Sequence, residues 1–279
     1  MRTRIALLLV LTTAACSTRV APSASRSATP PPGATEATAR LGASPRHGEW
    51  AMVPAGPGDS VRAWVVYPER RDRAPVVLVV HEIFGVTGWV RSVADQLAAD
   101  GYIAIAPDML TGKNVPTGPD GDPVRDSATA AIRTLAPADV QRRLDHVARY
   151  GMALPAALPK YGIVGFCWGG STAFAHAAHA PGLGAAVVYY GASPDSAALR
   201  TVRAPVLGLY GENDARVNAT IPRADSTLRA LGRTYQHEIF AGAGHGFLRA
   251  QDGQNGANLA ASQAAWPRTL AWFRTHLGR

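Results

Sequence analysis

The sequence predicts an α/β fold with a mostly parallel central sheet flanked by helices on both faces. Short apolar runs typical of buried strands alternate with longer segments whose apolar residues have helical spacing. The polar residues that could take part in catalysis directly follow those runs, at the strand ends where parallel sheets place their ligands. A length of 279 residues suits one such domain with extensions.

The first 16 residues have the layout of an export signal. A short positive start, Met1–Arg4, precedes an apolar run, Ile5–Leu11, that is too short to span a bilayer. Small residues then lead to Cys16, which resembles the lipidated cysteine of a bacterial lipoprotein signal, although secretory cleavage after Ala15 remains an alternative. We expect an exported protein, either periplasmic or anchored to a membrane by a lipid on Cys16.

Residues 17–45 are rich in Ala, Ser, Thr and Pro. Such a segment has too few large apolar groups to offset the entropy lost on ordering. We therefore predict a disordered linker over 17–45 and a single folded domain over 46–279.

The elements of the domain follow in order. A Gly-Pro-Gly-Asp turn at 56–59 predicts that the first two strands form a hairpin, and the continuous apolar run 75–80 is typical of a central parallel strand. Prolines at the first turns of two later helices fit positions that need no N–H. Strands are expected at 47–54, 61–68, 75–80, 102–106, 161–165, 185–190, 206–210 and 234–240. Helices are expected at 89–99, 123–135, 137–150, 170–180, 219–231 and 257–277.

Composition excludes several classes of function. The formal net charge is +8, but the arginines are scattered and no basic run or RNA-binding signature occurs, so we expect no nucleic-acid partner. His176 and His179 lack a third ligand and are expected to be packing or surface residues, with no metal and no cofactor. Cys167 is the sole cysteine of the predicted domain, which excludes an internal disulfide. We expect a monomer.

The most informative segment is Gly165-Phe166-Cys167-Trp168-Gly169-Gly170, between a predicted strand and a predicted helix. This is the context of a nucleophile elbow, in which the central side chain stands on a sharp turn above the sheet. Glycines two residues before and after Cys167 let strand and helix approach closely. Cysteine stands where serine is usual.

Two further residues complete a catalytic order. Asp214 follows the strand at 206–210, and His245 follows the strand at 234–240. Nucleophile, acid and histidine is the chain order of α/β-hydrolases, so we expect that fold. The histidine takes the proton of the nucleophile and returns it to the leaving group, while the carboxylate fixes the imidazole. The loop after the strand at 75–80 supplies an oxyanion donor in this fold, which points to the amides of Ile83 and Trp168.

The chain resembles the dienelactone hydrolase family over residues 47–278. The matching segments are His81-Glu82-Ile83-Phe84-Gly85, Ala106-Pro107-Asp108, the elbow, Asp214 and His245-Gly246-Phe247. The resemblance implies hydrolysis of a small carboxylic ester or lactone through a cysteine acyl-enzyme. It also implies that Glu82 contacts the resting cysteine and is displaced when substrate binds.

The resemblance further implies two arginines that hold a substrate carboxylate. Arg249 matches one, but Gly112 stands in place of the other and Lys113 follows it. We take Arg249 and Lys113 as substrate-binding candidates, and the glycine weighs against dienelactone itself. Two other functions remain open from the sequence. One is an α/β-hydrolase acting on thioesters, peptides or larger esters, and the other is a non-catalytic ligand-binding lipoprotein with a redox-reactive thiol.

Overall fold

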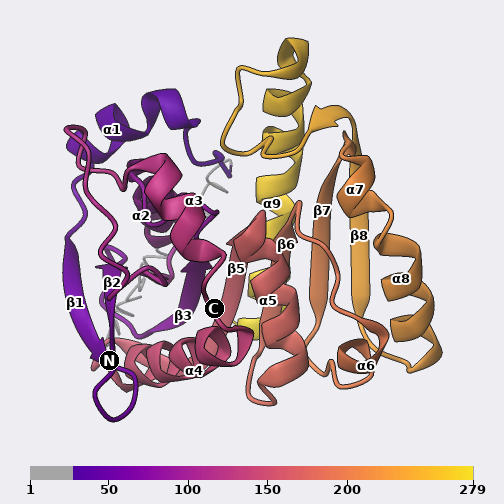
Figure 1. The fold of residues 1–279 in the computed structure, drawn as a ribbon, viewed down its shortest axis with the longest axis horizontal. Coiled ribbons are helices and arrows are strands. Elements are labelled where there is room, and N and C mark those ends of the chain that lie inside the picture. Colours follow the sequence, from indigo (N-terminus) through magenta and orange to yellow (C-terminus); the bar gives the residue numbers. More distant parts are fainter. Residues whose placement is uncertain (1–27, 279) are drawn as a thin grey trace, which may run out of the picture.

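The computed structural model describes residues 28–278, so the predicted signal peptide with Cys16 lies outside the described residues. Within them, eight strands form one sheet in the order β1-β2-β4-β3-β5-β6-β7-β8 (Figure 1). The strands are β1 (Gly48–Pro54), β2 (Ser60–Val66), β3 (Ala74–Val80), β4 (Ile103–Pro107), β5 (Ala157–Phe166), β6 (Ala185–Tyr189), β7 (Val206–Asn213) and β8 (Tyr235–Gly244). The pairs from β4 to β8 are parallel, as predicted.

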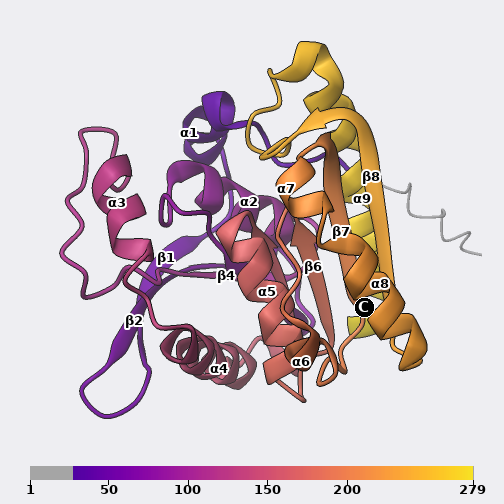
Figure 2. The same cartoon turned by 45° about the vertical axis from the view of Figure 1, so that its right-hand side comes forward.

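Helices cover both faces of this sheet, which confirms the predicted α/β-hydrolase architecture (Figures 1 and 2). The main helices are α1 (Ala34–Gly42), α2 (Gly88–Ala99), α3 (Arg125–Ile132), α4 (Pro137–Ala153), α5 (Trp168–His179), α8 (Ile221–Ala230) and α9 (Ala257–Leu277). Successive side chains of β3 point to opposite faces of the sheet and so belong to two separate layers of the core. Val76, Leu78 and Val80 pack in the layer that contains α4 and α5, whereas Val77 and Val79 pack in the layer that contains α2 and α9.

The predicted hairpin is present as β1 and β2, which pair antiparallel across the turn. Its turn residue Asp59 binds the guanidinium groups of Arg143 at 2.7 Å and Arg142 at 2.8 Å, both from α4. These contacts lower the pKa of Asp59 to about 2. The hairpin is thereby fixed to the helix that covers the sheet.

The predicted disordered linker is wrong for the part that the structure describes. Residues 34–42 form α1, which packs along α2 with Ala37 fully buried (Figure 2). Arg46, just after α1, makes a double hydrogen bond to the buried carboxylate of Asp95, at 2.9 and 2.6 Å. Composition missed this segment because its small residues pack against another element instead of forming a core of their own. We call residues 28–46 the strap.

Three further differences concern the ends of strands. β5 begins at Ala157, and β7 and β8 pair as far as Asn213 with Gly244, across a register shift between Gly211 and Asn213. Two short helices, α6 (Ser196–Leu199) and α7 (Ala215–Asn218), follow β6 and β7. The carboxylates of Asp195 and Asp214 accept hydrogen bonds from backbone amides in the first turns of α6 and α7, so these aspartates start the helices.

Among residues 28–278, no helix is both long and apolar enough to cross a membrane.

Candidate active site

Cys167 occupies the predicted elbow between β5 and α5, with φ +56° and ψ −115°. Residues other than glycine rarely adopt a positive φ, so the surrounding packing must hold this conformation. A Cβ on Gly165 would collide with the carbonyl of Gly169, and one on Gly169 would collide with the backbone of Val80 and His81. The two glycines are therefore required by the close approach of strand and helix.

The Cys167 thiol is partly buried, and its pKa is raised to about 11. Burial is the largest cause, and the negative charge of Glu82 adds to it. The backbone N–H of Trp168 and the cation of Arg216 act in the opposite direction. With its pKa raised in this way, the Cys167 side chain is a thiol at neutral pH.

His245 and Asp214 form a bonded pair at the ends of β8 and β7. The His245 Nδ1 lies 2.5 Å from the Asp214 Oδ2, with the aspartate buried and the histidine side chain 34% exposed. In the part of the chain that the structure describes, Cys167 makes no hydrogen bond to His245. The structure thus joins the acid to the histidine and leaves the thiol separate from them.

Glu82 and Arg249 form a second pair, deeper than the first. Their Oε2 and Nε atoms are 2.6 Å apart, and the Glu82 side chain is almost completely buried. Burial raises the pKa of Glu82, while the charges of Arg249, His245 and Arg125 oppose that rise. Glu82 therefore binds Arg249 in this structure and acts on Cys167 through its charge.

His81 lies beside the candidate site, and it has no role assigned from the sequence alone. Its Nε2 accepts a hydrogen bond from the Met109 amide at 3.1 Å, so its Nδ1 carries the proton and donates to the Glu82 carbonyl at 2.6 Å. Burial lowers the pKa of His81, which keeps the ring neutral, and Trp168 stacks on it at 5.5 Å. The ring fixes the loop that carries Glu82 and Ile83 beside the elbow.

The structure does not bring Lys113 to Arg249. Lys113 lines a cavity of about 260 Å³ with Asp59, Arg142 and Arg143. The cation near Arg249 is Arg125, at the start of α3, and both guanidinium carbons lie over the ring of Phe84, at 3.9 Å for Arg125 and 5.5 Å for Arg249. Sequence spacing could not indicate Arg125 because the irregular segment 111–124 sets where α3 begins.

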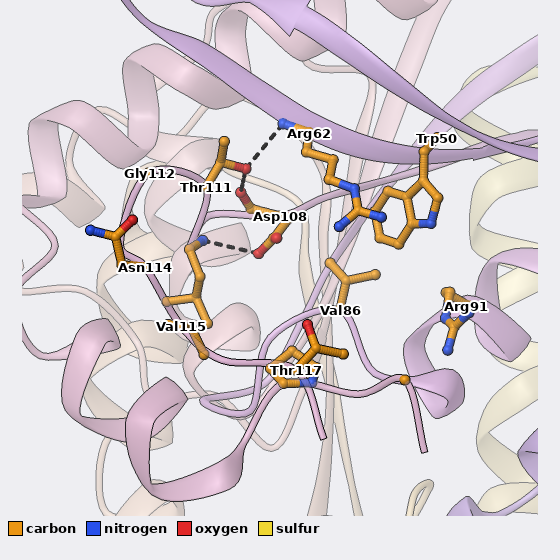
Figure 3. A pocket seen from close by; sticks show the side chains of 13 residues that line it. Trp50, Arg62, Val86, Arg91, Asp108, Thr111, Gly112, Asn114, Val115 and Thr117 are labelled. Atoms are coloured by element: carbon orange, nitrogen blue, oxygen red, sulfur yellow. Dashed lines mark hydrogen bonds between the residues drawn. The ribbon is translucent and has the colours of Figure 1, made fainter. Parts of the chain in front are cut away.

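Gly112 lines a different cavity, of about 400 Å³, which Figure 3 shows. Arg62 lies over the ring of Trp50 there at 3.7 Å, and the Asp108 carboxylate binds the amide of Leu110. Cys167 and His245 are not among the lining residues. The cavity next to the Glu82–Arg249 pair is smaller, about 170 Å³, and Phe84, Arg125 and Arg249 line it together with α1 of the strap.

His176 and His179 have protein partners, in agreement with the expectation of packing or surface roles. His176 is buried between Gln141 at 2.7 Å and Tyr161 at 3.2 Å, and burial lowers its pKa to about 4. His179 lies 2.8 Å from Asp145. Within residues 28–278 no three metal-ligating side chains converge on one point.

Comparisons with known proteins place the chain in a family. The model of the dienelactone hydrolase family matches residues 61–277. A Salmonella typhimurium protein, provisionally named a carboxymethylenebutenolidase, is 32% identical over 80% of this chain and 85% of its own. The chain belongs to the dienelactone hydrolase family. Members of this family hydrolyse lactones or esters, and this chain is a hydrolase of that class.

Solved structures of the dienelactone hydrolase family have the same fold. One from Klebsiella pneumoniae, provisionally titled a dienelactone hydrolase, has a TM-score of 0.71 and 31% identity, and the match covers 82% of this chain and 98% of that one. A dienelactone hydrolase from Anabaena variabilis has a TM-score of 0.62 at 22% identity, covering 83% and 98% of the two chains, and shows the fold alone.

Proposed function

We propose that this protein hydrolyses a small carboxylic ester or lactone with Cys167 as the nucleophile. The observation that carries the proposal is the strained elbow. It holds one thiol at the edge of the sheet where β7 and β8, the strands that precede Asp214 and His245, also end. A backbone conformation as costly as that of Cys167 persists where function requires it. A cysteine with a purely structural role would need neither the positive φ nor the two closely packed glycines, Gly165 and Gly169, on either side of it.

The proposed reaction has two halves. The Cys167 proton passes to His245, the sulfur attacks the acyl carbon, and the amides of Ile83 and Trp168 stabilise the oxyanion. The bond from carbon to the leaving oxygen breaks as His245 returns the proton, which leaves a thioester on Cys167. His245 then takes a proton from water, the hydroxide attacks the thioester, and the carbon–sulfur bond breaks to release the acid as His245 passes that proton to the Cys167 sulfur.

Glu82 controls when the thiolate forms in this proposal. A substrate carboxylate that binds Arg249 competes with Glu82 for the same guanidinium, whose two parallel donors suit either group. The negative charge of Glu82 is one cause of the raised pKa of Cys167, and displacement of Glu82 moves that charge relative to the thiol. Substrate binding and nucleophile activation are thereby coupled, and the idle thiol stays protonated.

The test compares the wild-type protein with Cys167→Ser and Cys167→Ala on lactones, thioesters and p-nitrophenyl esters of several chain lengths. We expect wild-type turnover of small esters or lactones and loss of at least about 10³-fold in Cys167→Ala. Ser226→Ala, at an exposed position of α8, is the control and should retain activity. Undiminished turnover in Cys167→Ala refutes the mechanism, and turnover of thioesters alone refutes the substrate class.

We also propose that residues 1–16 export the chain and that Cys16 receives a lipid. The support is the sequence layout described above. Expression of the full chain in a bacterium, followed by fractionation and mass spectrometry, tests this. A lipidated N-terminus at Cys16 is expected, and a soluble cytoplasmic product that retains Met1 contradicts it.

A further inference from the structure

The cavity of about 400 Å³ in Figure 3 is lined by neither Cys167 nor His245, and the proposed reaction makes no use of it. Its walls come from the β1–β2 hairpin, the start of α2 and the segment 108–123. These walls bring together two arginines and several apolar side chains, namely Arg62, Arg91, Val86, Leu110 and Val115. A few polar groups in an otherwise apolar hollow are the usual form of a small-molecule site.

The hairpin places the Arg62 guanidinium on the ring of Trp50. Trp50 pairs with Trp64 across the strands, so Arg62 is its diagonal neighbour on the same face, and the guanidinium carbon lies 3.7 Å from the ring centroid (Figure 3). The Arg62 amide donates to the Thr111 hydroxyl at 3.0 Å, and its carbonyl accepts from the Asp108 amide at 2.7 Å. Stacking uses the flat face of the guanidinium and leaves the N–H groups in its plane able to bind. The fork of Arg62 is therefore held in place before any ligand arrives.

The charges around this cavity favour an anion. Among the residues that the structure describes, the Arg62 guanidinium makes no ion pair. Asp108, the acid that lines the cavity, accepts a hydrogen bond from the Leu110 amide at 3.1 Å. Arg91 lies 3.2 Å from one oxygen of Asp122, which also accepts a backbone amide. Two cations and one acid line the cavity, so its potential is positive on balance.

Two buried donors near Arg91 point to the same class of ligand. Arg91 also lines a neighbouring cavity of about 490 Å³ together with Trp64, and its guanidinium carbon lies 5.9 Å from the Trp64 ring centroid. The Arg91 Nε and the Trp64 Nε1 are buried, and neither has a hydrogen-bond partner in the described part of the chain. A buried donor without an acceptor is destabilising. An anion beside Arg91 supplies acceptors to this end of the cavity.

We propose that this cavity is a second binding site, separate from the candidate active site, for a small organic carboxylate with an apolar body. The planar fork of Arg62 binds the carboxylate through two parallel hydrogen bonds, and Arg91 adds a second positive charge. The apolar body lies against Val86, Leu110 and Val115. The volume of the cavity suits a molecule of about 10–20 non-hydrogen atoms.

The test measures binding of three probes to the wild-type protein by titration calorimetry at constant ionic strength. Phenylacetate has both the carboxylate and an apolar ring. Phenylacetamide keeps that shape without the charge, and sulfate keeps a charge without the ring. We expect one phenylacetate to bind per chain with a dissociation constant below about 5 mM. Phenylacetamide and sulfate should each bind at least about 10-fold more weakly.

Four variants locate the bound phenylacetate. Arg62→Gln should weaken binding about 10- to 100-fold, the range for hydrogen bonds between charged groups, and Arg91→Gln should weaken it in the same direction. Arg71→Gln is the matched control, since it removes an exposed arginine beyond β2 that does not line the cavity. Arg249→Gln removes the cation of the candidate active site. Both of these variants should bind phenylacetate within about twofold of wild type. Circular dichroism confirms the fold of each variant, and Arg62 suits this test because its side chain is exposed.

The absence of saturable phenylacetate binding up to about 20 mM overturns the proposal. So does equal affinity for phenylacetamide or for sulfate, because the site would then recognise only shape or only charge. Unchanged binding in a folded Arg62→Gln variant also overturns it, as does a loss in Arg249→Gln, which would place the anion in the candidate active site. These outcomes are independent of ester turnover, so they stay distinct from a failure of the proposed function.

Discussion

The Glu82 carboxylate lies 2.6 Å from the Arg249 guanidinium and at the same time raises the pKa of the Cys167 thiol. One buried carboxylate therefore connects Arg249 with the proposed nucleophile. In the proposed mechanism, this connection keeps the resting cysteine protonated until a substrate displaces Glu82.

The first prediction concerns the reactivity of the thiol. With its pKa near 11, Cys167 should react slowly with iodoacetamide at pH 7 and faster as the pH rises toward that value. Glu82→Gln removes a negative charge that favours the protonated form, so the apparent pKa should fall and alkylation at pH 7 should accelerate. The measurement is the alkylation rate across pH, followed by intact mass. Identical profiles for both proteins would exclude the charge effect.

Arg249 should control selectivity for anionic substrates. Arg249→Gln should raise KM for mono-p-nitrophenyl succinate about 10- to 100-fold, because a charge-assisted double hydrogen bond is lost. p-Nitrophenyl butyrate should show a smaller change in KM. Arg229→Gln, which removes an exposed cation paired with Asp225, is the control. A similar loss on both esters would speak against carboxylate recognition.

Asp214 should be needed for turnover and dispensable for the fold. Asp214→Asn keeps the size of the side chain but no longer fixes the imidazole, and kcat should fall about 10³- to 10⁴-fold. Asp195→Asn is a close control, since both aspartates begin a four-residue helix after a strand. Steady-state kinetics and circular dichroism separate the two effects. Near-normal kcat in Asp214→Asn would remove it from the mechanism.

The strap should contribute to stability. Asp95 is buried and Arg46 is partly buried, and removing one partner of a buried ion pair costs about 3–5 kcal/mol. Arg46→Ala should lower the free energy of unfolding in urea by that order, whereas Glu36→Gln, at an exposed position of α1, should have little effect. A change below about 0.5 kcal/mol in Arg46→Ala would show that the strap is loosely held.

The strap should also affect Arg249. The Ala34 amide binds the Arg249 carbonyl at 2.8 Å, and the Gln251 amide binds the Pro31 carbonyl at 2.8 Å. Gln251→Ala should therefore raise KM for the succinate ester modestly, about two- to fivefold for one neutral hydrogen bond. Steady-state kinetics on both esters measure it. Unchanged KM on both would mean that the strap does not position Arg249.

Local sequence patterns predicted the fold and the elements that carry the candidate nucleophile. Strand alternation and the glycines around Cys167 are short-range signals, and the structure follows them closely. Asp214 and His245 were predicted from their places after strands, since parallel neighbours end at one edge of the sheet. The structure pairs those two residues directly.

The remaining features depend on contacts between distant segments. The pairing of Glu82 with Arg249 joins loops that are far apart in the chain, and Arg125 reaches Phe84 only because of how the preceding loop turns. The strap is a surface segment by composition and becomes ordered by packing on α2. No spacing rule connects such segments.

Trapping the acyl-enzyme tests the central claim most directly. Wild-type protein is mixed with excess mono-p-nitrophenyl succinate, quenched in acid within the first turnovers so that the thioester is not hydrolysed, and analysed by intact and peptide mass spectrometry. We predict a succinyl group on the peptide that contains Cys167, and none in Cys167→Ala. An acyl group on another residue, or wild-type turnover that persists without Cys167, would contradict the account.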